Sequence, residues 1–362
     1  MVRLGDVCKK ASSNIAQKDL EEHSGKYPIY GASGLIKHVD FYQQEQPYIA
    51  VVKDGAGIGR VMKLPAKSSV IGTMQYIIPN DIVDISYLAY AMEYMNLSKY
   101  FSGATIPHIY FKDYQKETLP LPPLDEQRCI AATLDKVTDL IAKRRQQLDK
   151  LDELVKARFV EMFGDVIQNT RHWPQLLFSE ITTSRLGKML DAKQQTGMCQ
   201  YPYLANFNVQ WFRFELKNLN QMDFSESDRS EFELQEGDLL VCEGGEIGRC
   251  AIWHNEIQPC YFQKALHRVR CNKEFVLPIY LAGWFKYNCE HKGFASIEGA
   301  KATIAHLPGA KLKQLLVAVP PVEVQNQFAD FVEQIEQVKT TISRSLEKLE
   351  TLKKALMQEY FK

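Results

Sequence analysis

Two glycine-rich stretches contain residue types that could bind a phosphate group. They read DGAGIG at 54–59 and EGGEIG at 243–248. The first has the G-x-G spacing of a nucleotide-binding loop, but the second does not, and apolar runs flank both stretches. This context is strand–turn–strand and lacks the helix that follows a phosphate-binding loop, so we predict two tight hairpin turns.

A pair of carboxylates is the next candidate for chemistry. Asp238 and Glu243 are spaced like the carboxylates of a nuclease, but no lysine follows at the spacing that a nuclease requires. Asp54, which matches Glu243 when the two glycine-rich stretches are aligned, has no corresponding partner. We therefore predict that these carboxylates belong to solvated turns.

Two histidines could act as general bases, but only beside a nucleophile or a metal ion. Neither accompanies His108 or His306, and hydrogen bonding with the neighbouring Thr105 and Thr303 is the alternative role. The eight cysteines include no C-x-x-C pair, and an Asn/Asp-Pro-Pro-aromatic signature of adenine methylation is absent. The sequence thus predicts no catalytic residue, no metal site and a chain that is not an enzyme.

The charge of the chain is balanced, with 44 Lys and Arg against 44 Asp and Glu among 362 residues. A DNA-binding protein that works alone usually has a basic excess, so we expect the isolated chain to bind nucleic acid weakly. The composition, 24% charged and 45% apolar, is that of a globular protein. No apolar run approaches the ~18 residues of a membrane span, and the scattered cysteines favour a reducing, cytoplasmic compartment.

The chain is an internal duplication. GATIPHI at 103–109 returns as KATIAHL at 301–307, and Pro122-Pro123 returns as Pro320-Pro321, both at an offset of 198. Upstream, DGAGIGRV matches EGGEIGRC at an offset of 189, and YPIY at 27–30 matches YPYL at 201–204 at an offset of 174. Because the order is kept while the offset grows, the second copy of this unit of roughly 180 residues carries extra loop residues.

Each copy ends in a predicted long helix, at about 125–163 and 323–361. Apolar residues recur at alternating spacings of three and four over about four heptads, which predicts a coiled-coil seam. We expect the two helices to pair antiparallel; packing on separate cores is the alternative. The predicted coiled-coil and partner interface consists of Gln127, Leu134, Val137, Ile141, Leu148, Leu151 and Val155, with Gln325, Val332, Ile335, Ile342, Leu346, Leu349 and Leu356 in the second helix.

The parts before each helix are predicted to be mixed α+β globules. Strand–turn–strand patterns surround both glycine-rich stretches, and DISYLAYAMEYMN and LPIYLAGWFKYNC are typical of short helices. The predicted fold class is α+β, with two globules related by internal duplication and joined by two long helices in an antiparallel coiled coil. We expect domains at 1–118 and 166–318, with helical segments at 119–165 and 319–362.

This organisation resembles one family, the specificity (S) subunits of type I restriction–modification systems. The resemblance covers the whole chain. Its strongest elements are the duplicated LPLPPLDEQRCIA and VAVPPVEVQNQFA with the leucine heptads that follow them, while YPIYGASG and DGAGIGR look like the family's target-recognition domains. One departure is Val324, which stands where the first copy has Glu126.

The resemblance implies that each globule reads one half of a bipartite, asymmetric target in double-stranded DNA. It implies that the helices set the separation of the half-sites and dock two methyltransferase (M) subunits, with restriction (R) motor-nuclease subunits also present. S-adenosylmethionine, ATP and Mg would belong to those partners, with no cofactor bound by this chain and no membrane involved. A protein-binding coiled-coil scaffold without DNA readout, and a diverged DNA enzyme, remain as alternatives.

Candidate DNA contacts lie around the glycine-rich stretches. Arg60 and Arg249 directly follow them at matched positions, which suits a phosphate contact that carries no sequence information; surface salt bridges are the alternative. Arg144 and Arg145 could bind phosphate or set the coiled-coil register. Unmatched polar residues nearby suit base reading, and GATIPHI is expected to brace these loops. The candidates are Ser33, Lys53, Arg60, Ser102, Thr105, His108, Asn206, Arg249, Lys301, Thr303 and His306.

Overall fold

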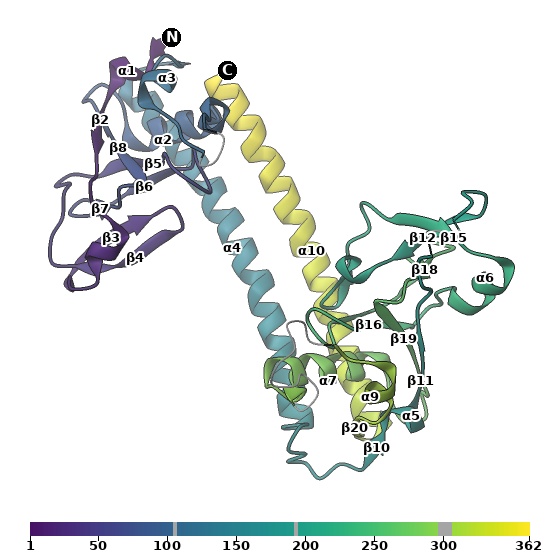
Figure 1. Ribbon diagram of the computed structural model, residues 1–362. Coiled ribbons are helices and arrows are strands. Elements are labelled where there is room, and N and C mark those ends of the chain that lie inside the picture. The colour runs from purple at the N-terminus through teal and green to yellow at the C-terminus, as the bar shows by residue number, and fades with distance from the viewer. Residues whose placement is uncertain (104–106, 192–194, 296–305) are drawn as a thin grey trace. The chain divides into compact units, whose positions relative to one another are not determined.

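The computed structural model describes residues 1–103, 107–191, 195–295 and 306–362, and the chain forms two compact units. Unit 1 comprises Met1–Gln147 and Thr341–Lys362, and unit 2 comprises Leu148–Thr340. The course of the chain can be followed in Figure 1. The long helices α4 (Leu124–Phe163) and α10 (Val322–Phe361) contribute residues to both units. They begin one residue before the predicted helices, and each begins directly after its Pro-Pro pair.

The described residues of unit 1 form three sheets. The four-stranded sheet has the order β2-β8-β5-β6, the three-stranded sheet β4-β3-β7 and the two-stranded sheet β1-β9. All five residues of the central β5, YIAVV, are buried. The strands are β1 (Val2–Arg3), β2 (Cys8–Ser12), β3 (Tyr27–Gly31), β4 (Gly34–Val39), β5 (Tyr48–Val52), β6 (Val61–Leu64), β7 (Ser69–Val70), β8 (Met74–Pro79) and β9 (Thr118–Leu119), and the short helices are α1 (Leu4–Val7), η1 (Gln17–Leu20), α2 (Ile85–Tyr94), η2 (Leu97–Tyr100) and α3 (Phe111–Tyr114).

Unit 2 repeats these sheets, with the orders β11-β19-β16-β17, β15-β12-β18 and β10-β20. The repeat extends to one parallel strand pair in each unit, β3 with β7 and β12 with β18. Unit 2 adds a separate hairpin, β13-β14. The elements are β10 (Gln175–Leu177), α5 (Phe178–Ile181), β11 (Thr182–Leu186), β12 (Gln200–Leu204), η4 (Asn206–Asn208), β13 (Val209–Gln210), β14 (Arg213–Phe214), β15 (Asn220–Asp223), α6 (Glu226–Phe232), β16 (Leu239–Cys242), β17 (Cys250–Ile252), β18 (Tyr261–Phe262), β19 (Leu266–Cys271), α7 (Pro278–Glu290), α9 (Gly309–Lys313) and β20 (Leu316–Ala318). The predicted α+β duplication is confirmed.

A buried glutamine joins the start of each long helix to the short helix of its globule. The Gln127 side chain accepts a hydrogen bond from the backbone N–H of Asp84 (2.8 Å), which is the N-cap of α2, and donates to the carbonyls of Ile82 (3.2 Å) and Pro122 (2.8 Å). Gln127 is fully buried, as is Gln325, its counterpart in unit 2. The amide oxygen and both amide hydrogens of Gln127 are therefore hydrogen-bonded.

Gln325 makes the same three contacts in unit 2. Its Oε1 accepts from the N–H of Leu277 (2.8 Å), the N-cap of α7, and its Nε2 donates to Phe275 (2.9 Å) and Pro320 (2.8 Å). The glutamine of each Pro-Pro-x-x-x-Gln stretch therefore orients its long helix against the globule.

The heptad seam of each long helix faces inward. Leu134, Val137 and Ile141 on α4 and Ile335 on α10 are buried. The other apolar seam residues are half-buried, namely Leu148, Leu151, Val155, Val332, Ile342, Leu346, Leu349 and Leu356. No predicted seam residue is exposed, which agrees with the predicted heptad register.

The two long helices run antiparallel within each unit. In the core of unit 1, Leu134 near the start of α4 lies with Met357 and Phe361 near the end of α10, while Arg145 pairs with Glu350 at 2.7 Å. In unit 2, Phe163 near the end of α4 packs on Phe328 near the start of α10, with ring centroids 5.4 Å apart. The ion pair of Asp152 with Lys339 at 2.9 Å follows the same direction. The predicted antiparallel pairing is confirmed.

Candidate nucleic-acid interface

Each unit has a glycine turn between two strands of its four-stranded sheet, at 53–60 between β5 and β6 and at 243–249 between β16 and β17. The turns close in the same way. The N–H of Val52 donates to the carbonyl of Arg60 (3.0 Å), and the N–H of Cys242 donates to the carbonyl of Arg249 (2.8 Å). Gly59 and Gly248 occupy the left-handed region with φ of +80° and +79°. A Cβ on Gly59 would collide with the backbone of Ser98, and one on Gly248 would lie 2.9 Å from Phe294, so both positions require glycine.

The first glycine turn is one residue longer than the second. The N–H of Ile109 donates to the carbonyl of Lys53 (2.9 Å), and the N–H of Leu307 donates to that of Glu243 (2.6 Å). Lys53 is therefore the structural counterpart of Glu243. The expected match of Asp54 with Glu243 is wrong, because a single offset cannot register an extra residue inside a turn.

The arginine after each turn reaches a second loop. Arg60 donates from Nη1 to the carbonyl of Ala32 (2.6 Å), and Arg249 donates from Nη2 to the carbonyl (3.1 Å) and side-chain oxygen (3.0 Å) of Asn206. Ala32 and Asn206 follow the matched strands β3 and β12 at an offset of 174. The matched arginine thus connects the same two loops in both units. Arg249 also lies 3.6 Å from the carboxylate of Glu246.

The repeated histidine segments lie against the glycine turns. Asp54 bridges to His108, and Gly244 bridges to His306, through their backbones. The Nδ1 of His108 also contacts the Asp54 carboxylate, whose other oxygen lies 3.0 Å from the Lys53 ammonium. Asp54 therefore connects a cation and an imidazole at the edge of the first turn.

A buried histidine is hydrogen-bonded to the segment that follows His306. His267 on β19 donates from Nε2 to the carbonyl of Leu307 (2.8 Å). Burial lowers the pKa of His267, although its hydrogen bond to Leu307 acts in the opposite direction. In the sheet of unit 1, Gln75 lies opposite Val51, as His267 lies opposite Val241 in unit 2. Unit 1 therefore has an uncharged amide side chain at the position of His267.

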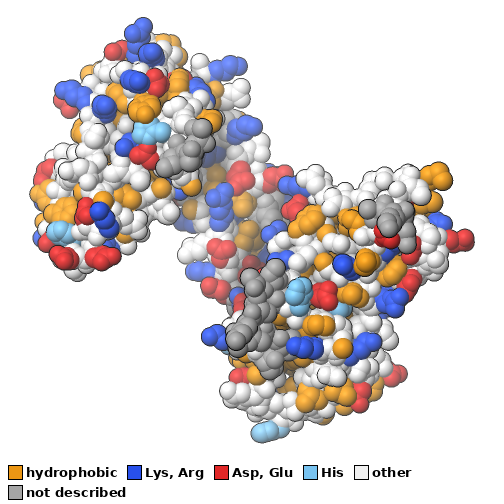
Figure 2. Space-filling view, viewed as in Figure 1, with side chains coloured by type: hydrophobic (Ala, Val, Ile, Leu, Met, Phe, Trp, Pro, Cys, Tyr) orange, Lys and Arg blue, Asp and Glu red, His pale blue; other side chains and the backbone are white. Residues whose placement is uncertain are grey.

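The structure brings most of the described candidates together in two loop clusters. In unit 1, Ser33 is exposed beside Ala32, and Ser102 pairs through its backbone with His108 (2.8 and 2.9 Å). In unit 2, the Asn206 amide donates to Gly244 (2.9 Å) between Arg249 and the His306 segment. Thr105, Lys301 and Thr303, with the hydrogen bonds expected of the two threonines, lie outside the described residues. On the face shown in Figure 2, Lys and Arg are interspersed with Asp and Glu.

Sequence reasoning missed the aromatic hairpin β13-β14 beside the second glycine turn. Trp211 at its tip donates from Nε1 to the Glu246 carboxylate (2.7 Å), and the Lys286 ammonium lies 4.3 Å from the centre of the Trp211 ring. The available signal was the growth of the repeat offset from 174 to 189 between YPYL and EGGEIG. That growth located the insertion but not its structure.

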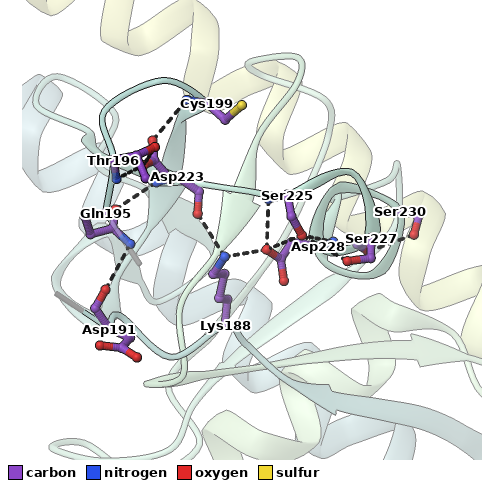
Figure 3. Close-up of polar contacts among 10 residues, drawn as sticks. All are labelled: Lys188, Asp191, Gln195, Thr196, Cys199, Asp223, Ser225, Ser227, Asp228 and Ser230. Atoms are coloured by element: carbon purple, nitrogen blue, oxygen red, sulfur yellow. Dashed lines mark hydrogen bonds and ion pairs between the residues drawn. The ribbon is translucent and has the colours of Figure 1, made fainter. Parts of the chain in front are cut away.

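A polar network shapes the loop that enters β12, as Figure 3 shows. The Asp223 carboxylate accepts hydrogen bonds from the N–H groups of Gly197 (2.7 Å) and Cys199 (3.1 Å) and from the Thr196 hydroxyl (2.9 Å). Burial raises the pKa of Asp223, but these hydrogen bonds outweigh it and lower the pKa below its usual range. Lys188 donates to the Asp223 carbonyl (2.9 Å) and to Asp228. Asp223, Lys188 and Asp228 are thus hydrogen-bonded within the protein, and their contacts position the loop before β12.

Burial raises the pKa of the Cys242 thiol to about 11, so this cysteine is protonated near neutral pH and is a poor nucleophile. Across the described ranges, no three His, Cys, Asp or Glu side chains are grouped to hold a metal ion. None of the described helices has both the length and the apolar character needed to cross a bilayer.

Comparison with known proteins places the two units in one family. A family model for the type I restriction modification DNA specificity domain matches residues 1–153 and again residues 178–354. The chain belongs to this family. Its two matches coincide with the two copies of the duplicated architecture, so this specificity subunit carries two DNA-specificity domains.

Individual relatives carry the same description. The chain is 22% identical to the EcoKI specificity subunit of Escherichia coli K12 over 92% of this chain and 78% of that protein. It is 30% identical to the MjaVIII specificity subunit of Methanocaldococcus jannaschii over 45% of this chain and 41% of that protein. The fold is similar to the crystal structure of an S subunit from M. genitalium, with a TM-score of 0.61 at 14% identity, covering 100% and 95% of the chains. Specificity subunits are the non-catalytic subunits of such systems.

Proposed function

We propose that this specificity subunit reads a bipartite, asymmetric target in double-stranded DNA, one half-site with each unit. The observation that supports this proposal is the construction of the same loop cluster twice, with a shared frame and different exposed side chains. The frame consists of the required glycine, the arginine contact and the histidine bridge. A frame that recurs is suited to contacts with the uniform phosphate backbone, and side chains that differ are suited to base edges.

The differences between the clusters favour two unlike half-sites. Lys53 in unit 1 stands where unit 2 has Glu243, and Ser33 stands where unit 2 has Phe207. A lysine suits guanine and a glutamate suits the amino group of cytosine. Two readers with such different surfaces are expected to select different sequences, which makes the complete target asymmetric.

We further propose that α4 and α10 set the separation of the half-sites and dock methyltransferase and restriction subunits. Readers that meet one face of B-DNA need half-site centres about one helical turn, ~10–10.5 bp, apart. S-adenosylmethionine, ATP and Mg are then bound by the partner subunits. The balanced charge of 44 against 44 supports this assembly, because the partners would supply much of the phosphate neutralisation.

Methylome sequencing of cells with and without this chain tests the proposal, provided that its cognate methyltransferase is present. We expect a split adenine-methylation motif that disappears with the chain. Exchanging residues 27–60 for those of a relative with another target should change one half of the motif and leave the other unchanged. A motif that is independent of the chain would refute DNA readout, and co-purification with the methyltransferase without any motif would support the scaffold alternative.

Binding by purified components provides a second test. The isolated chain is expected to bind DNA weakly, with specific binding only when methyltransferase subunits are added. Nanomolar sequence-specific binding by the chain alone at physiological salt would contradict the proposed division of labour.

A further inference from the structure

The hairpin β13-β14 ends in an aromatic tip that the described strands of unit 1 do not have. Gln210 pairs with Arg213, so Trp211 and Phe212 form a two-residue turn. Phe212 has a φ of +61°, which lies in the left-handed region that bulky side chains rarely occupy. Its side chain is nevertheless 46% exposed, so burial of the ring does not explain the choice of phenylalanine.

The tip is held firmly in this conformation. The backbone N–H of Phe212 donates to the carbonyl of Cys250 (2.9 Å) on β17. The neighbouring Trp211 is fixed by Glu246 and Lys286, as described above. An unfavourable backbone conformation persists only where the surroundings determine it, and such positions are concentrated at functional sites.

The surroundings of the tip favour DNA as its partner. Glu246, which binds Trp211, belongs to the second glycine turn together with Arg249, and Asn206, in the loop after β12, is hydrogen-bonded to that turn. Arg213 is exposed next to Phe212, and Phe207, which precedes the hairpin, is 55% exposed. Cations beside an exposed aromatic ring suit a ligand with phosphates on its outside and flat apolar groups within.

We propose that Phe212 inserts between two base pairs of the half-site read by unit 2, with Arg213 at an adjacent phosphate. This inference rests on the proposed DNA-reading function. Apolar side chains that wedge between base steps unstack them and bend the duplex. Pyrimidine–purine steps such as TA and CA/TG unstack most easily, so the half-site of unit 2 contains one of them where Phe212 enters.

The test uses the complete chain assembled with its methyltransferase subunits. Phe212→Asn removes the ring but suits the left-handed backbone, because asparagine tolerates this region better than phenylalanine. Phe212→Trp keeps an aromatic wedge. Phe275→Asn is the matched control, since Phe275 is 40% exposed and follows β19 at the end opposite the glycine turn.

The readouts are DNA affinity and the fluorescence of 2-aminopurine placed at successive positions of the target. The wild-type complex and Phe212→Trp should raise the fluorescence at one step of the half-site of unit 2. Phe212→Asn should abolish that rise and weaken specific binding roughly tenfold, while its thermal unfolding is unchanged or improved. Phe275→Asn should behave as wild type.

Three results would overturn the inference. Phe212→Asn could retain both the affinity and the fluorescence rise. The variant could also keep the weak DNA binding of the isolated wild-type chain but fail to assemble with its methyltransferase subunits, which would make the tip a protein contact. The fluorescence could also rise equally, at the same position, in the wild-type complex and in all of the variants. Absence of specific binding by the wild-type complex would instead refute the proposed function itself.

Discussion

The ring of Phe361 on α10 lies 5.1 Å from the ring of Tyr87 on α2, although 274 residues separate them in the sequence. Phe361 and Met357 are buried in the main core of unit 1, where they pack with Leu134 of α4. The first globule therefore depends on the end of the second long helix. Unit 2 ends at Thr340 and does not include this part of α10.

Replacing Phe361 with alanine should destabilise unit 1 by ~3–5 kcal/mol, because it deletes a buried ring from a packed core. Hydrogen exchange should show the loss in β5 and α2. All four tryptophans, at 173, 211, 253 and 284, lie in unit 2, so unfolding followed by tryptophan fluorescence should not change. Leu352→Ala on the exposed face of α10 is the control. Equal losses in both units would contradict the assignment of Phe361 to unit 1.

Gln127→Ala and Gln325→Ala should each destabilise their own unit by ~1–3 kcal/mol. The reason is that each leaves a buried backbone N–H, of Asp84 or of Leu277, without its acceptor. Hydrogen exchange of these two amides should accelerate in the corresponding variant. The double variant should show additive losses, since the two sites share no partner. Gln146→Ala, which is exposed on α4, should have little effect; cross-effects between the units would show that the two contacts are not independent.

Arg60→Ala should weaken DNA binding by the assembled complex similarly for all sequences and lower the salt slope by about one, as expected for loss of one phosphate contact. Arg249→Ala should additionally relax the preference at the half-site of unit 2, because the Asn206 side chain loses its hydrogen bond from Arg249. Affinities measured at several salt concentrations separate these effects. A changed half-site with an unaltered slope would make Arg60 a base reader, and no effect would leave it as the loop contact that the structure shows.

Unit 2 should lose stability as the pH falls below about 6.5, the ordinary pKa of histidine. The pKa of His267 is lowered in the folded unit, so the unfolded chain binds a proton first, and protonation then favours unfolding. The loss from this residue should stop once the pH is below the folded pKa, with a slope of at most ~1.4 kcal/mol per pH unit. Urea unfolding followed by tryptophan fluorescence measures it. His267→Gln, the residue type of Gln75 in unit 1, should flatten the dependence; an identical pH profile would exclude His267 as its source.

The elements predictable from sequence were those with a long or repeated pattern. The heptads that include Leu134 and Ile335 defined the long helices, and the recurrence of glycine and arginine located both turns. The parallel pairing of β3 with β7 was not predictable, because a strand of two residues has no period to detect. The acceptor of Arg60 lies 28 residues away, and no local pattern indicates such a contact. The left-handed conformation of Phe212 was also not predictable, because phenylalanine rarely adopts it.

The division of the chain into a continuous and a discontinuous unit has a consequence for its biosynthesis. Unit 2 is an unbroken stretch, Leu148–Thr340, and can fold once that stretch has left the ribosome. Unit 1 needs Thr341–Lys362 as well, so its first 147 residues wait while the whole of unit 2 is translated. At about 5–20 residues per second, this wait lasts on the order of ten seconds or more. The copy that is made first is therefore the copy that is finished last, and the core residues that pack on Met357 and Phe361 lack these partners until the end of α10 has been made.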